Sequence, residues 1–162
     1  IKSYNERLAE RGLVAADETS SKRSPEFAAA VSQLLLRNAA LDADLGRFAR
    51  AHASIDRHLA GERGGAAGLV ALGDLHLRQG DGAEQQQAAL AAYVAAVEAQ
   101  PTFAPAHRAR GLALRDAGRS EEAAAALARY LELEPAAVDA PIIRGYLTEA
   151  GGALGAAPRA GR

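Results

Sequence analysis

The sequence predicts an all-α protein, and its composition is the first reason. Of the 162 residues, 42 are Ala and 20 are Leu, whereas only seven are aromatic. Alanine has the highest helix propensity, and aromatic and β-branched residues are the ones that favour strands. The chain therefore has little from which to build a sheet. Its length is that of one domain or a short repeat array with a buried core.

The composition also excludes several classes of function. The formal net charge is −1 with both signs interspersed, which is not the pattern of a nucleic-acid-binding protein. Because there is no cysteine, we expect no disulfide framework, thiolate metal site or cysteine nucleophile. The longest uninterrupted apolar run, 88–97, is too short to span a bilayer.

Residues 1–24 are predicted to form a polar N-terminal arm. Ser3 and Glu6 have the spacing of a capping box and predict a short helix that Gly12 ends. The sequence begins with Ile1 and contains no Met, which predicts that the natural start lies further upstream. A signal peptide, a lipid anchor and a further domain are the alternatives for that missing part.

Residues 25–65 are predicted to form a helical hairpin. Ser24 and Pro25 mark its start, since Ser accepts hydrogen bonds from the first helical amides and Pro fits the first helical position. Apolar residues at helical spacing predict one helix over 25–38 and a second over 41–60. The apolar stripe expected on the second helix consists of Leu41, Leu45, Phe48, Ile55 and Leu59. Glycines within 61–68 form the closing loop.

A repeat follows this hairpin. Three pairs of glycines share one short spacing: Gly73 and Gly80, Gly111 and Gly118, and Gly145 and Gly152. The step from Gly111 to Gly145 matches a repeat period of about 34 residues, which is typical of a solenoid of helix pairs. The step from Gly73 to Gly111 is slightly longer, and the extra residues fall in one turn. We predict no strand, and helices over 66–79, 84–99, 104–117, 120–132 and 140–150.

Each recurring residue type has a physical role. Small residues are expected where the two helices of a unit approach each other closely, namely at Gly73, Gly111, Ala89, Ala96 and Ala123. Glycines with positive φ are expected where the chain turns, at Gly80 and Gly118. Prolines are expected to end the second helix of each unit, at Pro101 and Pro135.

These residues resemble the tetratricopeptide repeat (TPR), a helix–turn–helix unit of the same period. The matching positions are Leu72, Gly73, Gly80, Ala89, Tyr93, Ala96, Pro101, Gly111, Gly118, Ala123, Leu127, Pro135 and Gly145. His76 stands where Tyr is usual. The resemblance covers 66–152 as two repeats and a capping helix, with 25–65 as a degenerate repeat and 153–162 as a flexible tail. It implies a short right-handed α-solenoid of stacked antiparallel helix hairpins.

No catalytic or metal site is predicted. His52 and His58 are about 240° apart around a helix, so their rings do not converge. His52 and Asp56 are one helical turn apart, which indicates a solvated pair on a helix surface. Glu121 and Glu122 begin a helix, where negative charge suits the macrodipole. Because no catalytic motif is present, we expect neither an enzyme nor a cofactor.

The resemblance implies a binding surface on the concave face, which the first helix of each unit lines in TPR arrays. The candidate residues are Asp74, Leu77, Arg78, Arg108, Leu112, Arg115, Ile142, Tyr146 and Glu149. The three arginines suit a ligand with carboxylates, because guanidinium pairs with them bidentately. Family members that bind a C-terminal carboxylate use Asn and Lys there. This sequence has neither at these positions, so a chaperone tail is not the expected ligand.

The sequence therefore predicts a non-catalytic interaction or scaffolding module that binds a protein or peptide, with an acidic ligand as a candidate. One alternative is the C-terminal docking or regulatory segment of a larger envelope enzyme, such as a metalloprotease. Residues 130–139 are similar to the last repeat of bacterial envelope proteins, which favours the periplasm or envelope. The other alternative to an interaction module is a homo-oligomer in which the N-terminal arm swaps between chains. The Arg and Ala bias is typical of a GC-rich bacterial genome.

Overall fold

The computed structural model describes residues 25–61 and 65–155. The predicted arm over 1–24 lies outside the described residues, as does the part of the predicted tail after Gly155. Within the described residues there is no strand, and the all-α class is confirmed.

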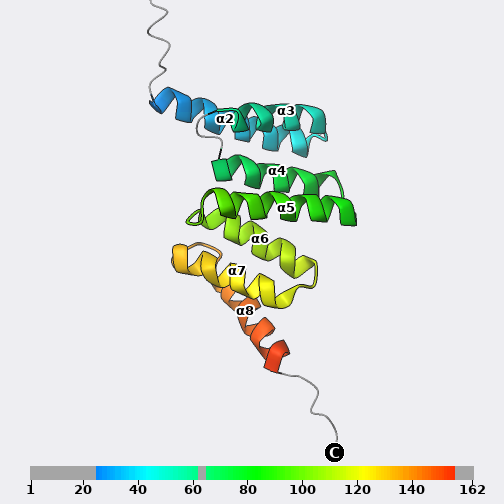
Figure 1. Ribbon diagram of the computed structural model, residues 1–162, viewed down its shortest axis with the longest axis vertical. Helices are drawn as coiled ribbons and strands as arrows, with labels where there is room; N and C mark the ends of the chain where they lie inside the picture. The colour runs from blue at the N-terminus through cyan, green and yellow to red at the C-terminus, as the bar shows by residue number, and fades with distance from the viewer. Residues whose placement is uncertain (1–24, 62–64, 156–162) are drawn as a thin grey trace, which may run out of the picture. The chain divides into compact units, whose positions relative to one another are not determined.

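The chain divides into two compact units, Ile1–Val31 and Ser32–Arg162, and the second is described here. Its helices follow one another in chain order, with α2 beginning in the first unit (Figure 1). The helices are α2 (Pro25–Asp44), α3 (Phe48–Leu59), α4 (Gly65–Gln79), α5 (Ala83–Ala99), α6 (Ala104–Asp116), α7 (Ser120–Leu133) and α8 (Ala140–Gly155). From α3 on, each helix packs on the next, and α4 also contacts α6. This is the predicted α-solenoid of helix hairpins.

The first hairpin turns later than the sequence predicted, at residues 45–47. Gly46 causes the difference, because its φ of 71° lies in the left-handed region. Its amide donates to the carbonyl of Ala43 (3.0 Å), and the amide of Arg47 donates to the carbonyl of Asp42 (2.7 Å). These two bonds form a Schellman motif, which ends α2.

This later turn changes which residues form the core. Leu41 lies on α2 and Leu45 in the turn after it, and both are exposed, so the first two members of the predicted stripe were wrong. Ile55 is buried as expected. The core that it joins links three helices through Ala39 and Ala43 of α2, Ala51 of α3 and Leu75 of α4.

The pairs α4–α5 and α6–α7 are in close contact at two glycines. A Cβ atom on Gly111 would lie 2.7 Å from Cγ and Cδ2 of Leu127, and one on Gly73 would overlap the ring of Tyr93. Both large side chains are fully buried. The two helices of each pair can therefore approach this closely only because glycine has no side chain.

The turn glycines differ from each other. Gly118 has a φ of 74°, and the amide of Arg119 donates to the carbonyl of Leu114 (2.9 Å) in a second Schellman motif. The expectation of a positive φ at Gly80 was wrong. The turn there continues through Asp81 before α5 begins, so no single residue has to reverse the chain.

The ends of the second helices agree with the proline positions. α5 ends at Ala99, just before Pro101, and α7 ends at Leu133, just before Pro135. The carbonyl of Pro101 accepts a hydrogen bond from Nε2 of the buried His107 (2.9 Å). This bond joins the start of α6 to the turn before it.

Gly111→Leu tests the close approach of α6 and α7. We expect overpacking against Leu127 to lower the free energy of unfolding by about 1–3 kcal/mol, measured by urea or thermal melting. Gly145→Leu is the matched control, because a Cβ atom there would meet nothing within 4 Å. Equal stability of the two variants would contradict the assigned packing.

Candidate functional site

The nine predicted binding residues lie on α4, α6 and α8, and we call this surface the α4–α6–α8 face. Leu77 and Ile142 are its exposed apolar residues. Leu112, Arg115 and Tyr146 are half-buried, and the other members are exposed. Contacts between α4 and α6, and side-chain contacts from α6 to α8, make it one surface.

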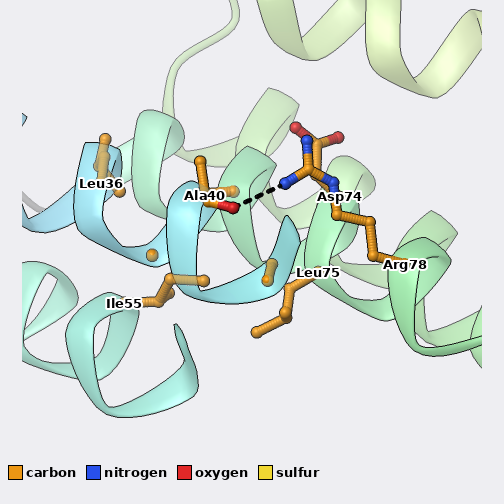
Figure 2. Close-up of a pocket in the computed structure, with 9 residues that line it drawn as sticks. Leu36, Ala40, Ile55, Asp74, Leu75 and Arg78 are labelled. Atoms are coloured by element: carbon orange, nitrogen blue, oxygen red, sulfur yellow. Dashed lines mark hydrogen bonds between the residues drawn. The ribbon is translucent and has the colours of Figure 1, made fainter. Parts of the chain in front are cut away.

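Arg78 joins α4 to α2. Its Nη1 lies 3.0 Å from Oδ1 of Asp44 and donates to the carbonyl of Ala40 (3.2 Å), as Figure 2 shows for the second contact. Arg78 and Asp74 line a hollow of about 50 Å³ between α2, α3 and α4. That volume holds a few water molecules rather than a ligand side chain.

Asp74 is held by a neighbouring tyrosine. The hydroxyl of Tyr93 on α5 donates to Oδ1 of Asp74 on α4 (2.7 Å). Burial raises the pKa of Tyr93 above its usual value, and the charge of Asp74 raises it further. The phenol therefore stays a hydrogen-bond donor at physiological pH.

Arg108 is paired with Asp139, a residue that the sequence analysis did not single out. Nε of Arg108 donates to Oδ2 of Asp139 (2.5 Å), and the hydroxyl of Tyr130 donates to Oδ1 (2.6 Å). The hydrogen bond from Tyr130 lowers the pKa of Asp139 below its usual value, and the bond from Arg108 lowers it further. Burial, followed by the bond to Asp139, raises the pKa of Tyr130 to about 12.

Arg115 connects α6 to α8. Its guanidinium lies 4.2 Å from the ring centroid of Tyr146, in a cation–π contact. Nε and Nη2 donate to Oδ1 of Asp116 at 3.0 and 2.7 Å. All three predicted arginines thus have a carboxylate partner in this chain, and the face does not present three free positive charges.

A larger hollow of about 210 Å³ lies between α6, α7 and α8. Three predicted residues line it, Arg115, Tyr146 and Glu149. The α7 wall and one α8 residue are not among the predicted binding residues, because the resemblance implies binding positions only on the expected concave surface. These lining residues are Ser120, Ala123, Ala124, Leu127 and Leu147. The volume is below that of most small-molecule pockets and suits a single side chain of a partner.

The histidines make structural contacts. Nε2 of His52 accepts a hydrogen bond from the Gln79 amide (2.9 Å), and its ring meets the ring of His76 edge-on. His52 therefore contacts α4, whereas the sequence predicted a pair with Asp56 on its own helix. His58 is buried, and its Nδ1 lies 2.8 Å from Oγ of Ser32.

Neither a metal site nor a membrane span is found in the described part of the chain. Residues 25–61 and 65–155 contain no group of three or more His, Asp or Glu side chains placed to hold a metal ion. No helix in these ranges is both long and apolar enough to cross a bilayer.

Asp139→Asn tests the link between α6, α7 and α8. We expect a loss of about 1 kcal/mol in unfolding free energy at neutral pH. A carboxylate with a lowered pKa stabilises the folded state above its unfolded pKa, so the difference should shrink as the pH falls below about 4. Denaturant titrations across pH check this. Glu132→Gln, in an exposed pair with Arg129, is the control and should change stability little. If the stability difference between Asp139→Asn and the wild type did not depend on pH, the role of the Asp139 carboxylate in this link would be contradicted.

Comparison with known proteins identifies the fold. No protein-family model matches the sequence, and no curated protein sequence matches it significantly. The first TPR domain of Spaghetti (RPAP3), bound to the HSP90 peptide SRMEEVD, is similar in structure, with a TM-score of 0.61 and 18% identity. The match covers 77% of this chain and 94% of that chain.

Two further solved structures agree. The first TPR domain of human RPAP3 gives a TM-score of 0.62 at 18% identity, covering 77% of this chain and 93% of that one. MamA gives a TM-score of 0.59 at 18% identity, and the match covers 96% of this chain and 86% of that one. The chain therefore has the fold of TPR domains, in agreement with the repeat seen in its sequence.

Proposed function

We propose that this chain is a non-catalytic interaction module that binds a peptide or partner helix on the α4–α6–α8 face. The observation that carries the proposal is the 210 Å³ hollow between α6, α7 and α8. Its walls are apolar at Ala124 and Leu147, and Tyr146 and Glu149 of the face border it. A partner side chain seated there would be surrounded by both apolar and polar groups, as is usual in recognition sites.

The structural neighbours support a peptide as the ligand class. A TPR domain that covers 77% of this chain is bound to the HSP90 peptide SRMEEVD. The face lacks the Asn and Lys that family members use for a C-terminal carboxylate, so we do not expect SRMEEVD itself to bind. The fold supports the mode of binding, and the side chains of the face set the sequence that it accepts.

An acidic ligand has to replace carboxylates of the chain itself. The side chains of Asp44 and Asp116 are 62% and 65% exposed, so both can move into solvent. Asp139 is less exposed and is also held by Tyr130. We therefore expect Arg78 and Arg115 to meet ligand carboxylates, while Arg108 keeps its structural partner.

Ala124→Phe tests the hollow, because the ring would fill it. We expect partners recovered from a lysate of the source organism by the immobilised chain, and identified by mass spectrometry, to be lost or to bind at least about tenfold more weakly, a difference of about 1.4 kcal/mol. Ala125→Phe is the matched control, since Ala125 is exposed on the same helix and does not line the hollow. Equal recovery by both variants would exclude the hollow as the site.

The combined change of Arg78→Ala and Arg115→Ala tests the acidic ligand. Exposed ion pairs contribute about 0–1 kcal/mol each, so the fold should be retained. Affinity for an acidic partner should fall at least about tenfold, and its dependence on salt should become flatter, as titration calorimetry at two salt concentrations would show. Arg129→Ala, on α7, is the control. An unchanged affinity would mean that the partner does not use these arginines.

A further inference from the structure

A second surface, on the first hairpin, carries an exposed apolar stripe. Leu34 and Leu41 of α2 and Leu45 of the turn that follows it are 56%, 58% and 55% exposed. Leu34 and Leu41 are close to two helical turns apart, so they lie on one side of α2. The amide of Leu45 donates to the carbonyl of Leu41 (3.1 Å), so Leu45 continues the row by one more turn. Single exposed leucines are normal, whereas three in a row along the first hairpin make a candidate interaction site.

A groove of about 470 Å³ lies beside this stripe, between α2 and α3, and Leu41 belongs to both. We call it the α2–α3 groove. The residues that α2 contributes to it are Leu35, Asn38, Leu41 and Asp42. The residues from the turn and α3 are Arg47, Arg50, Ala53, Ser54 and Arg57.

The charge of the α2–α3 groove is positive. Three guanidinium groups line it against one carboxylate. Arg47 Nη1 and Arg50 Nε each lie 3.8 Å from an oxygen of Asp42, so the two arginines share one loose partner. On the α4–α6–α8 face, by contrast, each arginine has its own carboxylate within 3.0 Å.

We propose that the α2–α3 groove binds an acidic amphipathic helix of a partner protein. Its apolar side would pack on Leu34, Leu41 and Leu45, and its Asp or Glu side chains would pair with Arg47, Arg50 and Arg57. This is the helix-in-groove mode of recognition. The stripe extends over about 16 Å, which corresponds to three turns of the bound helix. The proposal concerns a different surface from the α4–α6–α8 face and stands independently of it.

The charge also decides against the other obvious occupant, a second copy of this chain. Two copies joined through their grooves would bring together the arginines of both, with only one aspartate from each copy to compensate them. Like charges at an interface oppose association. An acidic helix instead compensates the excess charge and covers the leucines at the same time.

Synthetic helical peptides test the proposal with the full chain, and a length of about 15 residues is enough to span the stripe. The probe has leucines at alternating spacings of three and four with flanking Glu, and the matched peptide has Lys in place of each Glu. We expect the Glu peptide to bind, as measured by fluorescence anisotropy, and to bind more weakly as salt rises. The Lys peptide should bind at least about tenfold more weakly. No binding, or equal binding of the two peptides, overturns the proposal.

Variants locate the bound peptide. The double variant Leu34→Ser and Leu41→Ser, and separately Arg50→Glu with Arg57→Glu, should each weaken the Glu peptide at least about tenfold. Circular dichroism checks that these exposed changes leave the helices folded. Leu77→Ser on the α4–α6–α8 face is the control and should leave affinity unchanged.

Two results would assign the surface differently and overturn the proposal. An equal loss with Leu77→Ser would place the peptide on the α4–α6–α8 face. A dimer in light scattering that the Leu34 and Leu41 double variant dissociates would show that a second copy is the occupant.

Discussion

The close approach of two helices at a residue without a side chain is the constraint on which the repeat region depends. Because Gly111 lies under Leu127, the rotation of α6 about its own axis is determined. Arg108 and Arg115 are about 60° and 40° from Gly111 around α6, so this packing also determines where they point, and there Arg108 meets Asp139 and Arg115 meets Tyr146. In the same way, the contact of Gly73 with Tyr93 determines the rotation of α4 about its axis. The glycines therefore determine both the packing inside each pair and the set of side chains that the α4–α6–α8 face presents.

The parts of the fold that depend on neighbouring residues could be predicted from the sequence. Helix propensity and the spacing of glycine and proline are local, and they indicated the helices and the close contacts. The turn at Gly46 was missed although Gly80 follows it at the repeat period, because Ala39 stands where the other pairs have their first glycine and the apolar residues on either side of Gly46 continue at helical intervals. Which glycine forms a turn depends on hydrogen bonds that exist only in the folded chain.

The partners of the functional side chains could not be predicted for a related reason. Helical periodicity assigns Arg78 and Arg108 to a face, but Asp44 and Asp139 are distant from them in the sequence and meet them only through packing. Charge counted along the chain therefore overstated the positive potential of the α4–α6–α8 face. In the α2–α3 groove, by contrast, Arg47 and Arg50 share Asp42 as their partner.

Two tyrosines make the same kind of bond with different effects on how the array unfolds. Tyr93 bonds to Asp74 within the α4–α5 pair and so adds to the intrinsic stability of that pair. Tyr130 bonds to Asp139 at the start of the next helix and adds to the interface between neighbours. In a one-dimensional repeat protein these are separate quantities, and the interface energy sets cooperativity. Loss of the Tyr130 bond should therefore weaken the coupling between α7 and α8, whereas loss of the Tyr93 bond should lower the stability of the α4–α5 pair itself.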